Sequence, residues 1–232
     1  MKRKSKRLIL LALLLVAILL FAACGKTPEA PNWITISARG VVNGGGFSGE
    51  ELDIPAMASD GTVVKKIDSN AFDGYTTLKK VTLPDTITEI GFAAFRGCTG
   101  LTGIVIPDSV TEMDFCAFEN CTALASVTLG SGCARISAST FEGCTALTSI
   151  TVPDSVTEIR AYAFNNCKAL ASVSLPAGLQ SIGGIAFGGC KALTQITFRG
   201  TQAEWEAVEK GTLLDDLGTF TVHCTDGTLT SK

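Results

Sequence analysis

The chain repeats itself every 23 residues through its central part. A phenylalanine and a leucine recur at this spacing in six consecutive copies without insertion or deletion. The phenylalanines are Phe72, Phe95, Phe118, Phe141, Phe164 and Phe187, and the leucines are Leu78, Leu101, Leu124, Leu147, Leu170 and Leu193. A fixed period of this length predicts a solenoid, because one short coil buries its apolar side chains only by stacking on its neighbours.

Each copy contains two stretches with the character of a short strand. In the third copy, Val127 and Leu129 have the period-two spacing of one strand face, and Thr128 points to the other face. Proline follows this stretch in four copies and ends the strand, because it has no N–H group to donate. The second stretch, such as 155–159, directs Val156 and Ile159 inward. We therefore expect a β-rich solenoid whose equivalent strands lie about 4.8 Å apart.

A tight turn is expected in every coil, directly before the repeated cysteine position. Only glycine and asparagine occur there: Gly74, Gly97, Asn120, Gly143, Asn166 and Gly189. These two residue types adopt a left-handed backbone at low cost, so we expect a positive φ angle at each of them. The Ala-Phe pair before the turn is expected to fill the convex side of the coil.

The repeat L-x-x-I-x-L-P-x-x-(V/L)-x-x-I-x-x-x-A-F-x-x-C resembles that of the BspA-like leucine-rich repeat family of bacterial surface proteins. Copies two to six match it from about Ile90 to Phe198, and the first copy has Tyr75 in place of the cysteine. The resemblance implies a right-handed, curved solenoid with a parallel sheet on its concave face. It also implies attachment to the cell surface and binding of a protein or of a host or matrix macromolecule.

The segments that flank the repeats resemble the caps of the same family. The N-terminal segment, GEELDIPAMASDGTVVKKIDSNAF at 49–72, is expected to form a hairpin that leads into the first coil. In the C-terminal segment, Thr201 and Glu204 form a capping box, which predicts the start of a helix. Trp205 and Val208 lie on one face of that helix and would cover the last coil.

The expected organisation has five parts. They are a lipoprotein signal peptide at 1–23, a tether at 24–32, an N-terminal cap hairpin at 33–66, a leucine-rich repeat solenoid of six coils at 67–200, and a C-terminal cap with a short helix and strand at 201–232.

The N-terminus has the pattern of a bacterial lipoprotein signal. A basic stretch precedes an uncharged apolar run at 8–23, which is short for a membrane span of roughly 20 residues. The sequence LFAAC at 20–24 resembles the lipobox of bacterial lipoproteins, in which the cysteine receives a diacylglyceryl group, so Cys24 is the expected lipidation site. An uncleaved signal anchor is the alternative. Both interpretations place the body outside the cytoplasmic membrane, with the anchor as its only membrane contact.

The charge of the mature chain excludes one class of partner. Removal of residues 1–23 leaves 14 of the 19 Lys and Arg against 22 Asp and Glu, a net charge of −8. Nucleic-acid binding depends on neutralisation of phosphates by Lys and Arg, so an acidic body argues against it.

Five cysteines share one position of the repeat: Cys98, Cys121, Cys144, Cys167 and Cys190. The simplest interpretation is that they fill the core as small apolar groups. Stacking would place their Cα atoms about 5 Å apart, which a disulfide tolerates, so disulfides and a metal or redox site are the alternatives. The chain has no C-x-x-C pair and a single histidine, His223, in the C-terminal cap, so the usual zinc spacing is absent. Catalytic motifs and cofactor fingerprints are absent as well, which predicts a protein that is not an enzyme.

Acidic residues form two columns across the repeat: Asp85, Asp108 and Asp154, and Glu89, Glu112 and Glu158. The third copy breaks both columns, with Ser131 in one and Arg135 in the other. A solvated face with Arg135 placed between Glu112 and Glu158 is one interpretation. A weak site for a divalent cation or a basic partner is the other.

The outward positions of the first strand form a small, neutral and hydroxyl-rich face. The candidate binding residues on this face are Lys80, Thr82, Thr128, Ser149, Thr151, Ser174, Gln195 and Thr197. Because the energetically dominant residues of interfaces are most often Trp, Tyr or Arg, this composition suits a broad contact of low affinity. The sequence thus predicts a non-enzymatic surface lipoprotein that binds a macromolecule, and a spacer lipoprotein without a dedicated ligand is the alternative.

Overall fold

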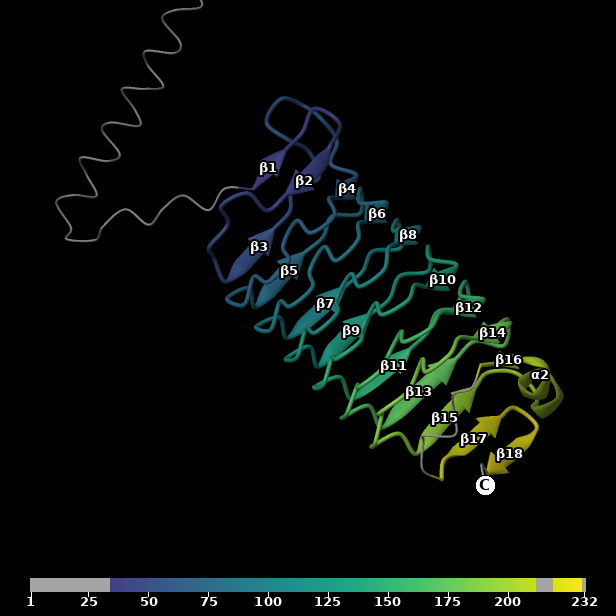
Figure 1. Ribbon diagram of the computed structural model, residues 1–232. Helices are drawn as coiled ribbons and strands as arrows, with labels where there is room; N and C mark the ends of the chain where they lie inside the picture. The colour runs from purple at the N-terminus through teal and green to yellow at the C-terminus, as the bar shows by residue number, and fades with distance from the viewer. Residues whose placement is uncertain (1–33, 212–218, 231–232) are drawn as a thin grey trace, which may run out of the picture. The chain divides into compact units, whose positions relative to one another are not determined.

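The computed structural model describes residues 34–211 and 219–230 as a β-solenoid of about eight stacked turns (Figure 1). Each turn contributes one strand to each of two parallel rows. The front row consists of β3 (Glu51–Asp53), β5 (Lys80–Thr82), β7 (Gly103–Val105), β9 (Ser126–Thr128), β11 (Ser149–Thr151), β13 (Ser172–Leu175), β15 (Gln195–Phe198) and β17 (Thr221–Cys224). The rear row consists of β2 (Val41–Asn43), β4 (Lys66–Ile67), β6 (Glu89–Ile90), β8 (Glu112–Met113), β10 (Arg135–Ile136), β12 (Glu158–Ile159), β14 (Ser181–Ile182) and β16 (Glu209–Lys210). The predicted solenoid with parallel sheets is confirmed.

The strands pair in the register that the repeat dictates. Ile150 lies opposite Val173, which in turn lies opposite Ile196, and each step is one period of 23 residues. Equivalent residues of successive coils therefore contact one another, and every apolar column of the sequence becomes a continuous buried ridge. The signal peptide, the tether and Cys24 lie outside the described residues. Within the described ranges, no helix combines the length and the apolar character that crossing a membrane requires.

The six repeated phenylalanines form one ladder through the core. Their side chains are completely buried, and neighbouring ring centroids lie between 5.2 and 5.7 Å apart. The rings are nearly parallel, with interplanar angles between 3° and 13°. Each ring thus buries both faces against the coils on either side, which is why a single coil has no core of its own. We number the coils one to six by the phenylalanine that each contains.

The predicted left-handed turn is confirmed in every coil. The φ angles of the glycine and asparagine column lie between 59° and 75°. A second left-handed column, which the sequence did not reveal, has φ angles between 50° and 60° at Asn70, Ala93, Cys116, Ser139, Tyr162 and Ile185. Hydrogen bonds to the next coil, such as Cys116 N to Ala138 O at 3.1 Å, hold these residues in place. The stack of coils therefore imposes this conformation on residues that rarely adopt it alone.

Aromatic residues pack at both ends of the solenoid. At the N-terminal end, β1 (Thr35–Ile36) and β2 form an antiparallel hairpin, and Phe47 packs against Phe72 and Tyr75 with centroid distances of 6.3 Å. Tyr75 thus replaces the cysteine in the coil where the ladder begins. At the C-terminal end, α2 (Gln202–Ala207) begins at the predicted capping box, and its buried Trp205 lies 5.4 Å from the ring of Phe198. The strand β18 (Gly227–Thr230) then pairs antiparallel with β17.

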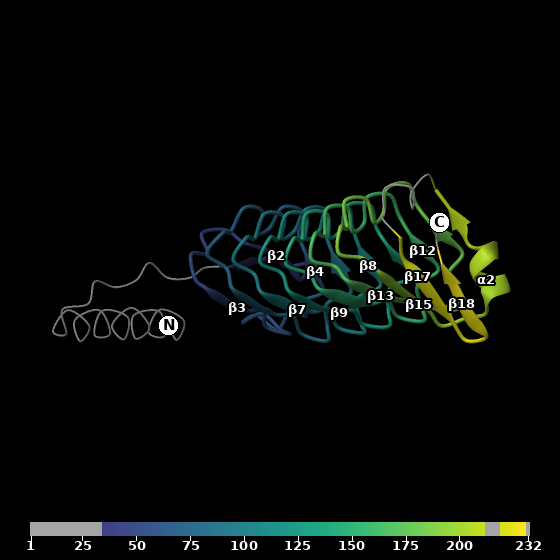
Figure 2. The same ribbon diagram turned by 90° about the horizontal axis from the view of Figure 1, so that it is seen from below.

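Both rows are interrupted at the same level of the stack. The front row is divided into a sheet that ends with β9 and a sheet that starts with β11, and the rear row is divided between β8 and β10. The chain crosses this plane at 129–134, where the third copy has Gly130-Ser131 in place of the Pro-Asp pair of the first, second and fourth copies. Coils three and four therefore meet without strand pairing in either row. Figure 2 shows the stack of coils from below the view of Figure 1.

The ladder predicts a large difference between two phenylalanines of coil three. Phe118→Ala should lower the free energy of unfolding by about 3–5 kcal/mol, because the ring is fully buried between Phe95 and Phe141. Phe115→Ala is the matched control, since Phe115 is 42% exposed, and its effect should stay near 0.5 kcal/mol. Denaturant unfolding followed by circular dichroism measures both values, and equal losses would contradict the account of the core.

Candidate functional site

The candidate binding residues lie together on the exposed face of the front row. Lys80 and Thr82 belong to β5, Thr128 to β9, Ser149 and Thr151 to β11, Ser174 to β13, and Gln195 and Thr197 to β15. All of these side chains are exposed except that of Ser174, which is partly buried. Val105 on β7 occupies the same outward column and is 62% exposed, so it belongs to this face as well. These residues therefore share one face of the front row, and their role in binding is considered below.

Two adjoining hollows mark this face over coils one to four. The larger one, of about 460 Å³, extends from Lys80 and Thr82 across Gly103 and Val105 to Thr128. The smaller one, of about 390 Å³, lies between β9 and β11 and is lined by Val127, Thr128, Leu129, Ser149, Thr151 and Pro153. Because Thr128 lines both, the hollows are neighbours on one surface.

Among the candidate residues only Lys80 is charged, and both it and its neighbour Lys79 form ion pairs. Lys79 Nζ lies 2.8 Å from Glu50 Oε1, and Lys80 Nζ lies 3.5 Å from Glu51 Oε2. These side chains are more than half exposed, so solvent weakens both ion pairs. The remaining candidate residues are uncharged, and the face therefore offers hydroxyl groups and small apolar surfaces rather than a charged patch.

Arg199 links neighbouring coils in the C-terminal half of the front row. Its Nη1 donates to Ser174 Oγ at 2.9 Å, and its Nη2 donates to Val152 O at 2.8 Å and also contacts Asp154. The backbone N–H of Arg199 in coil six donates to Leu175 O in coil five. The equivalent bond from coil five to Val152 O in coil four cannot form, because the residue at that position is Pro176, which has no N–H group. The guanidinium thus supplies the missing donor, and it joins coils four, five and six.

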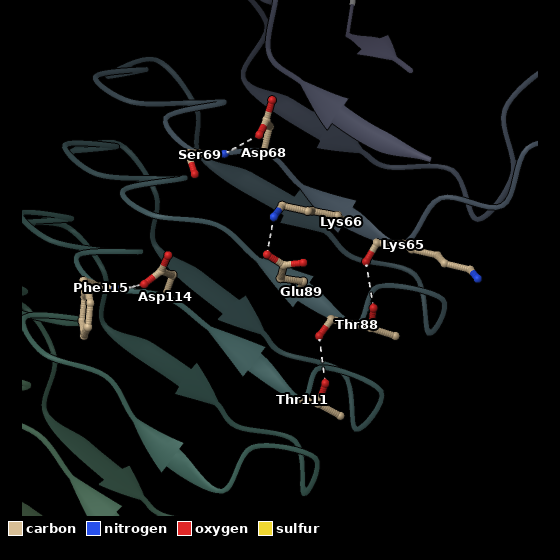
Figure 3. Close-up of polar contacts among 9 residues, drawn as sticks. All are labelled: Lys65, Lys66, Asp68, Ser69, Thr88, Glu89, Thr111, Asp114 and Phe115. Carbon is tan, nitrogen blue, oxygen red and sulfur yellow. Dashed lines mark hydrogen bonds and ion pairs between the residues drawn. The ribbon is translucent and has the colours of Figure 1, made fainter. Parts of the chain in front are cut away.

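The acidic columns are compensated mostly by residues other than the expected one. Lys66 of β4 points toward Glu89 of β6 and forms an ion pair with it, as Figure 3 shows. This contact raises the pKa of Lys66. Arg135 lies opposite Glu158 in the register of β10 and β12, but it is Arg160 that pairs with Glu158, at 3.1 Å. Arg135 thus lies between the positions of Glu112 and Glu158 in the rear row, but among the described residues it forms no ion pair with either, and no strand pairing joins β8 to β10.

The aspartate column also has partners within the protein. Asp108 Oδ1 accepts hydrogen bonds from Ser131 N at 2.7 Å and from Ser131 Oγ at 3.0 Å. The bond from the backbone N–H holds the pKa of Asp108 below its usual value. Asp154 contacts Arg199. Residues 34–211 and 219–230 contain no group of three or more His, Cys, Asp or Glu that could hold a metal ion.

The repeated cysteines are buried rungs of the core. Each thiol donates a hydrogen bond to the backbone carbonyl of the phenylalanine in the preceding coil. Cys98, the first of the five, donates to Phe72 O, and Cys121 donates to Phe95 O at 3.1 Å. Burial raises the pKa of Cys98 and of Cys144 to about 12, so both are protonated at neutral pH and are poor nucleophiles. All eight described cysteines are free thiols. The structure thus favours the interpretation that the thiols fill the core.

Cysteines outside this column show no catalytic arrangement either. Cys133 is buried and donates to Val110 O at 3.1 Å. Cys116 is partly exposed, and burial together with its contact to Glu119 raises its pKa to about 11. Cys224 neighbours the exposed His223 on β17, but adjacent residues of a strand point to opposite faces.

Comparisons with known proteins agree with this architecture. Residues 65–194 and 157–206 match the family model described as a BspA type leucine-rich repeat region, with six copies. The crystal structure of a leucine-rich repeat protein from T. pallidum is 31% identical, with 75% of this chain and 85% of that chain covered and a TM-score of 0.65. A leucine-rich repeat protein from Eubacterium ventriosum is 29% identical, with 71% of this chain and 44% of that chain covered and a TM-score of 0.62. No curated protein matches the sequence significantly.

Proposed function

The chain belongs to the BspA-type leucine-rich repeat family, and from this premise we propose that it is a non-enzymatic protein of the bacterial surface that binds another macromolecule. The partner is a protein or a macromolecule of the host or its matrix. It contacts the front row, where Lys80, Thr82, Thr128, Ser149, Thr151, Ser174, Gln195 and Thr197 lie.

The observation that carries this proposal is the open face of the front row. Strands β5 to β15 present a wide surface of exposed hydroxyl groups with two adjoining hollows, and the exposed Val105 lines the larger of the two. Such a surface forms many weak contacts and lacks the dense charge that nucleic-acid binding needs. The buried, protonated thiols and the absence of a metal-binding group among the described residues agree with a scaffold rather than a catalyst.

The proposed location follows from the leader. A basic stretch, an apolar run and Cys24 in a lipobox-like sequence support lipid attachment of the mature chain outside the cytoplasmic membrane. A diacylglyceryl group on Cys24 would be the only membrane contact. The short polar segment at 25–32 would then serve as the tether between the lipid and the solenoid.

A spacer lipoprotein without a dedicated ligand is the second candidate. The observation in its favour is that the candidate residues on the front face include no Trp, Tyr or Arg, the side chains that most often dominate binding energy. A spacer would show no saturable binding to any extract, so one binding experiment separates the two candidates.

Bulky charges on the front face should abolish binding. Thr151→Arg and Thr197→Arg place a long cation on the proposed contact surface, and each should weaken saturable binding to a matrix or envelope extract at least tenfold. Thr99→Arg is the control, since Thr99 is exposed but lies in the turn after Cys98, away from β7. Solid-phase binding of the purified protein measures the effect. No saturable binding to either extract would support the spacer, and equal loss in all three variants would place the contact elsewhere.

Lipid attachment predicts a defined N-terminus. Mass spectrometry of the protein isolated from membranes should find Cys24 as the first residue with a diacylglyceryl group on its sulfur, and Cys24→Ala should release the protein from the membrane fraction. An unmodified Cys24 in the membrane-bound protein would contradict the anchor and would favour the uncleaved signal sequence.

A further inference from the structure

The core reaches the surface at one level of the front row. Val127 and Leu129 of coil three are only partly buried. Their counterparts in the other coils are all buried, with exposed fractions of no more than 8%: Val81, Ile104, Ile150, Val173 and Ile196 in one column, and Leu83, Ile106, Val152, Leu175 and Phe198 in the other. The exposure of these two side chains is therefore a local property of coil three rather than of the repeat.

The loop at 129–134 lies beside this opening and packs tightly against coil two. A Cβ atom at Gly130 would lie 2.4 Å from Pro107 O, and one at Gly132 would lie 2.3 Å from Asp108 O. The bonds from Ser131 to Asp108 hold the loop to the same coil. The end of the loop is bonded to coil four as well, since Ser155 Oγ donates to Cys133 O at 2.8 Å and Thr157 N donates to Ala134 O at 2.9 Å. The opening therefore lies at β9 and β11 themselves.

Backbone hydrogen bonds are missing across the plane between β9 and β11. In neighbouring coils, Ile106 N donates to Thr128 O at 2.8 Å and Val152 N donates to Ser174 O at 2.9 Å. The equivalent N–H of Leu129 makes no such bond within the described chain, as is also true of Leu83 in coil one. Thr148 N makes none either, although its counterpart Ala125 N donates to Thr102 O. The N–H groups of Leu129 and Thr148 lie on the two sides of the opening and have no backbone acceptor among the described residues.

The opposite side of the same plane stays closed. Phe118 N donates to Thr140 O at 2.9 Å and Asn120 N donates to Glu142 O at 2.7 Å. The rings of Phe118 and Phe141 remain stacked, and their 5.7 Å separation is the largest in the ladder. Coils three and four are thus joined on the turn side, although no strand pairing joins them in either row.

We propose that the hollow between β9 and β11 is a subsite for an uncharged, extended polypeptide segment that inserts one apolar side chain against Val127, Leu129 and Pro153. The proposal rests on the proposed function and specifies which part of the front face the partner uses. The segment's backbone carbonyls accept from the N–H groups of Leu129 and Thr148, and its amides bond to the hydroxyl groups of the rim.

The chemistry of the lining selects this class of partner. Three of the six lining residues are apolar and the other three, Thr128, Ser149 and Thr151, carry hydroxyl groups that make no side-chain hydrogen bond within the described residues. The lining has no charge to attract an ion and no aromatic ring on which a sugar or a base would stack. A volume of about 390 Å³ lies in the range of about 300–1,000 Å³ that is typical of binding pockets. Unpaired strand N–H groups beside an apolar pocket match recognition of an extended peptide.

A displayed library of random twelve-residue peptides tests the proposal on the purified protein. Selected peptides should share one aliphatic or aromatic residue within an uncharged stretch. Thr128→Trp and Ser149→Trp each fill the hollow and should weaken their binding at least tenfold. Thr99→Trp is the matched control, because Thr99 is exposed in the turn after Cys98 and lines neither hollow, and it should leave the affinity unchanged. Circular dichroism melting shows whether each variant is folded. Two filling variants are used so that the test still stands if one of them does not fold.

Other outcomes would overturn the subsite and are distinguishable from failure of the proposed function. Peptides that bind Thr128→Trp and Ser149→Trp as tightly as the unmodified protein would exclude the hollow, even if extract binding is still lost in Thr197→Arg. The hollow is also excluded as a peptide subsite if the library yields no binder. The same holds if a glycan, and no peptide, competes with the extract for binding to the protein. Self-association that the filling variants abolish would identify a second copy of the chain as the occupant instead.

Discussion

The stacking of coil on coil is the interaction on which the rest of the structure depends. Each of the four inner phenylalanines of the ladder stacks on no ring of its own coil, and its faces are covered by the rings above and below. The thiol of the same coil reaches the carbonyl of the preceding phenylalanine, so the polar group beside the ladder is satisfied between coils as well. Stability is therefore a property of the array, and the two end coils need covers of a different kind. Phe47 with Tyr75 provides one cover and Trp205 the other.

Much of this architecture could be predicted from the sequence, because equivalent residues make the same contacts in every copy of the repeat. Six equivalent residues at one position show what that position requires, which is how the glycine and asparagine turn was recognised. The capping box at Thr201 could also be predicted, since its two side chains accept hydrogen bonds from backbone N–H groups only three residues away. Single-copy features were harder to predict. Arg199 reaches back 47 residues to Val152 O, and no local pattern signals that bond.

Two features escaped prediction for physical reasons. The second left-handed column contains Ala, Cys, Tyr and Ile, residues that do not signal a positive φ, because inter-coil hydrogen bonds rather than residue preference impose it. The interruption of both rows coincides with the Gly130-Ser131 substitution, whose loop packs against coil two. The substitutions in coil three were visible in the sequence, but their effect on the neighbouring strands depends on the position of carbonyl groups in three dimensions. The candidate face was located correctly by strand alternation, whereas its hollow could be seen only in the structure.

The central claim is that one continuous stack contains one level at which the sheets part and the aromatic ladder does not. Native-state amide hydrogen exchange, resolved by residue with NMR, tests it most directly. The amides of Leu129 and Thr148 should exchange much faster than those of Ile106, Ala125 and Val152, which occupy the same positions in closed coils. The amides of Phe118 and Asn120, which cross the same plane on the turn side, should stay protected. Equal protection of Leu129 and Ile106, or rapid exchange at Phe118, would contradict this account.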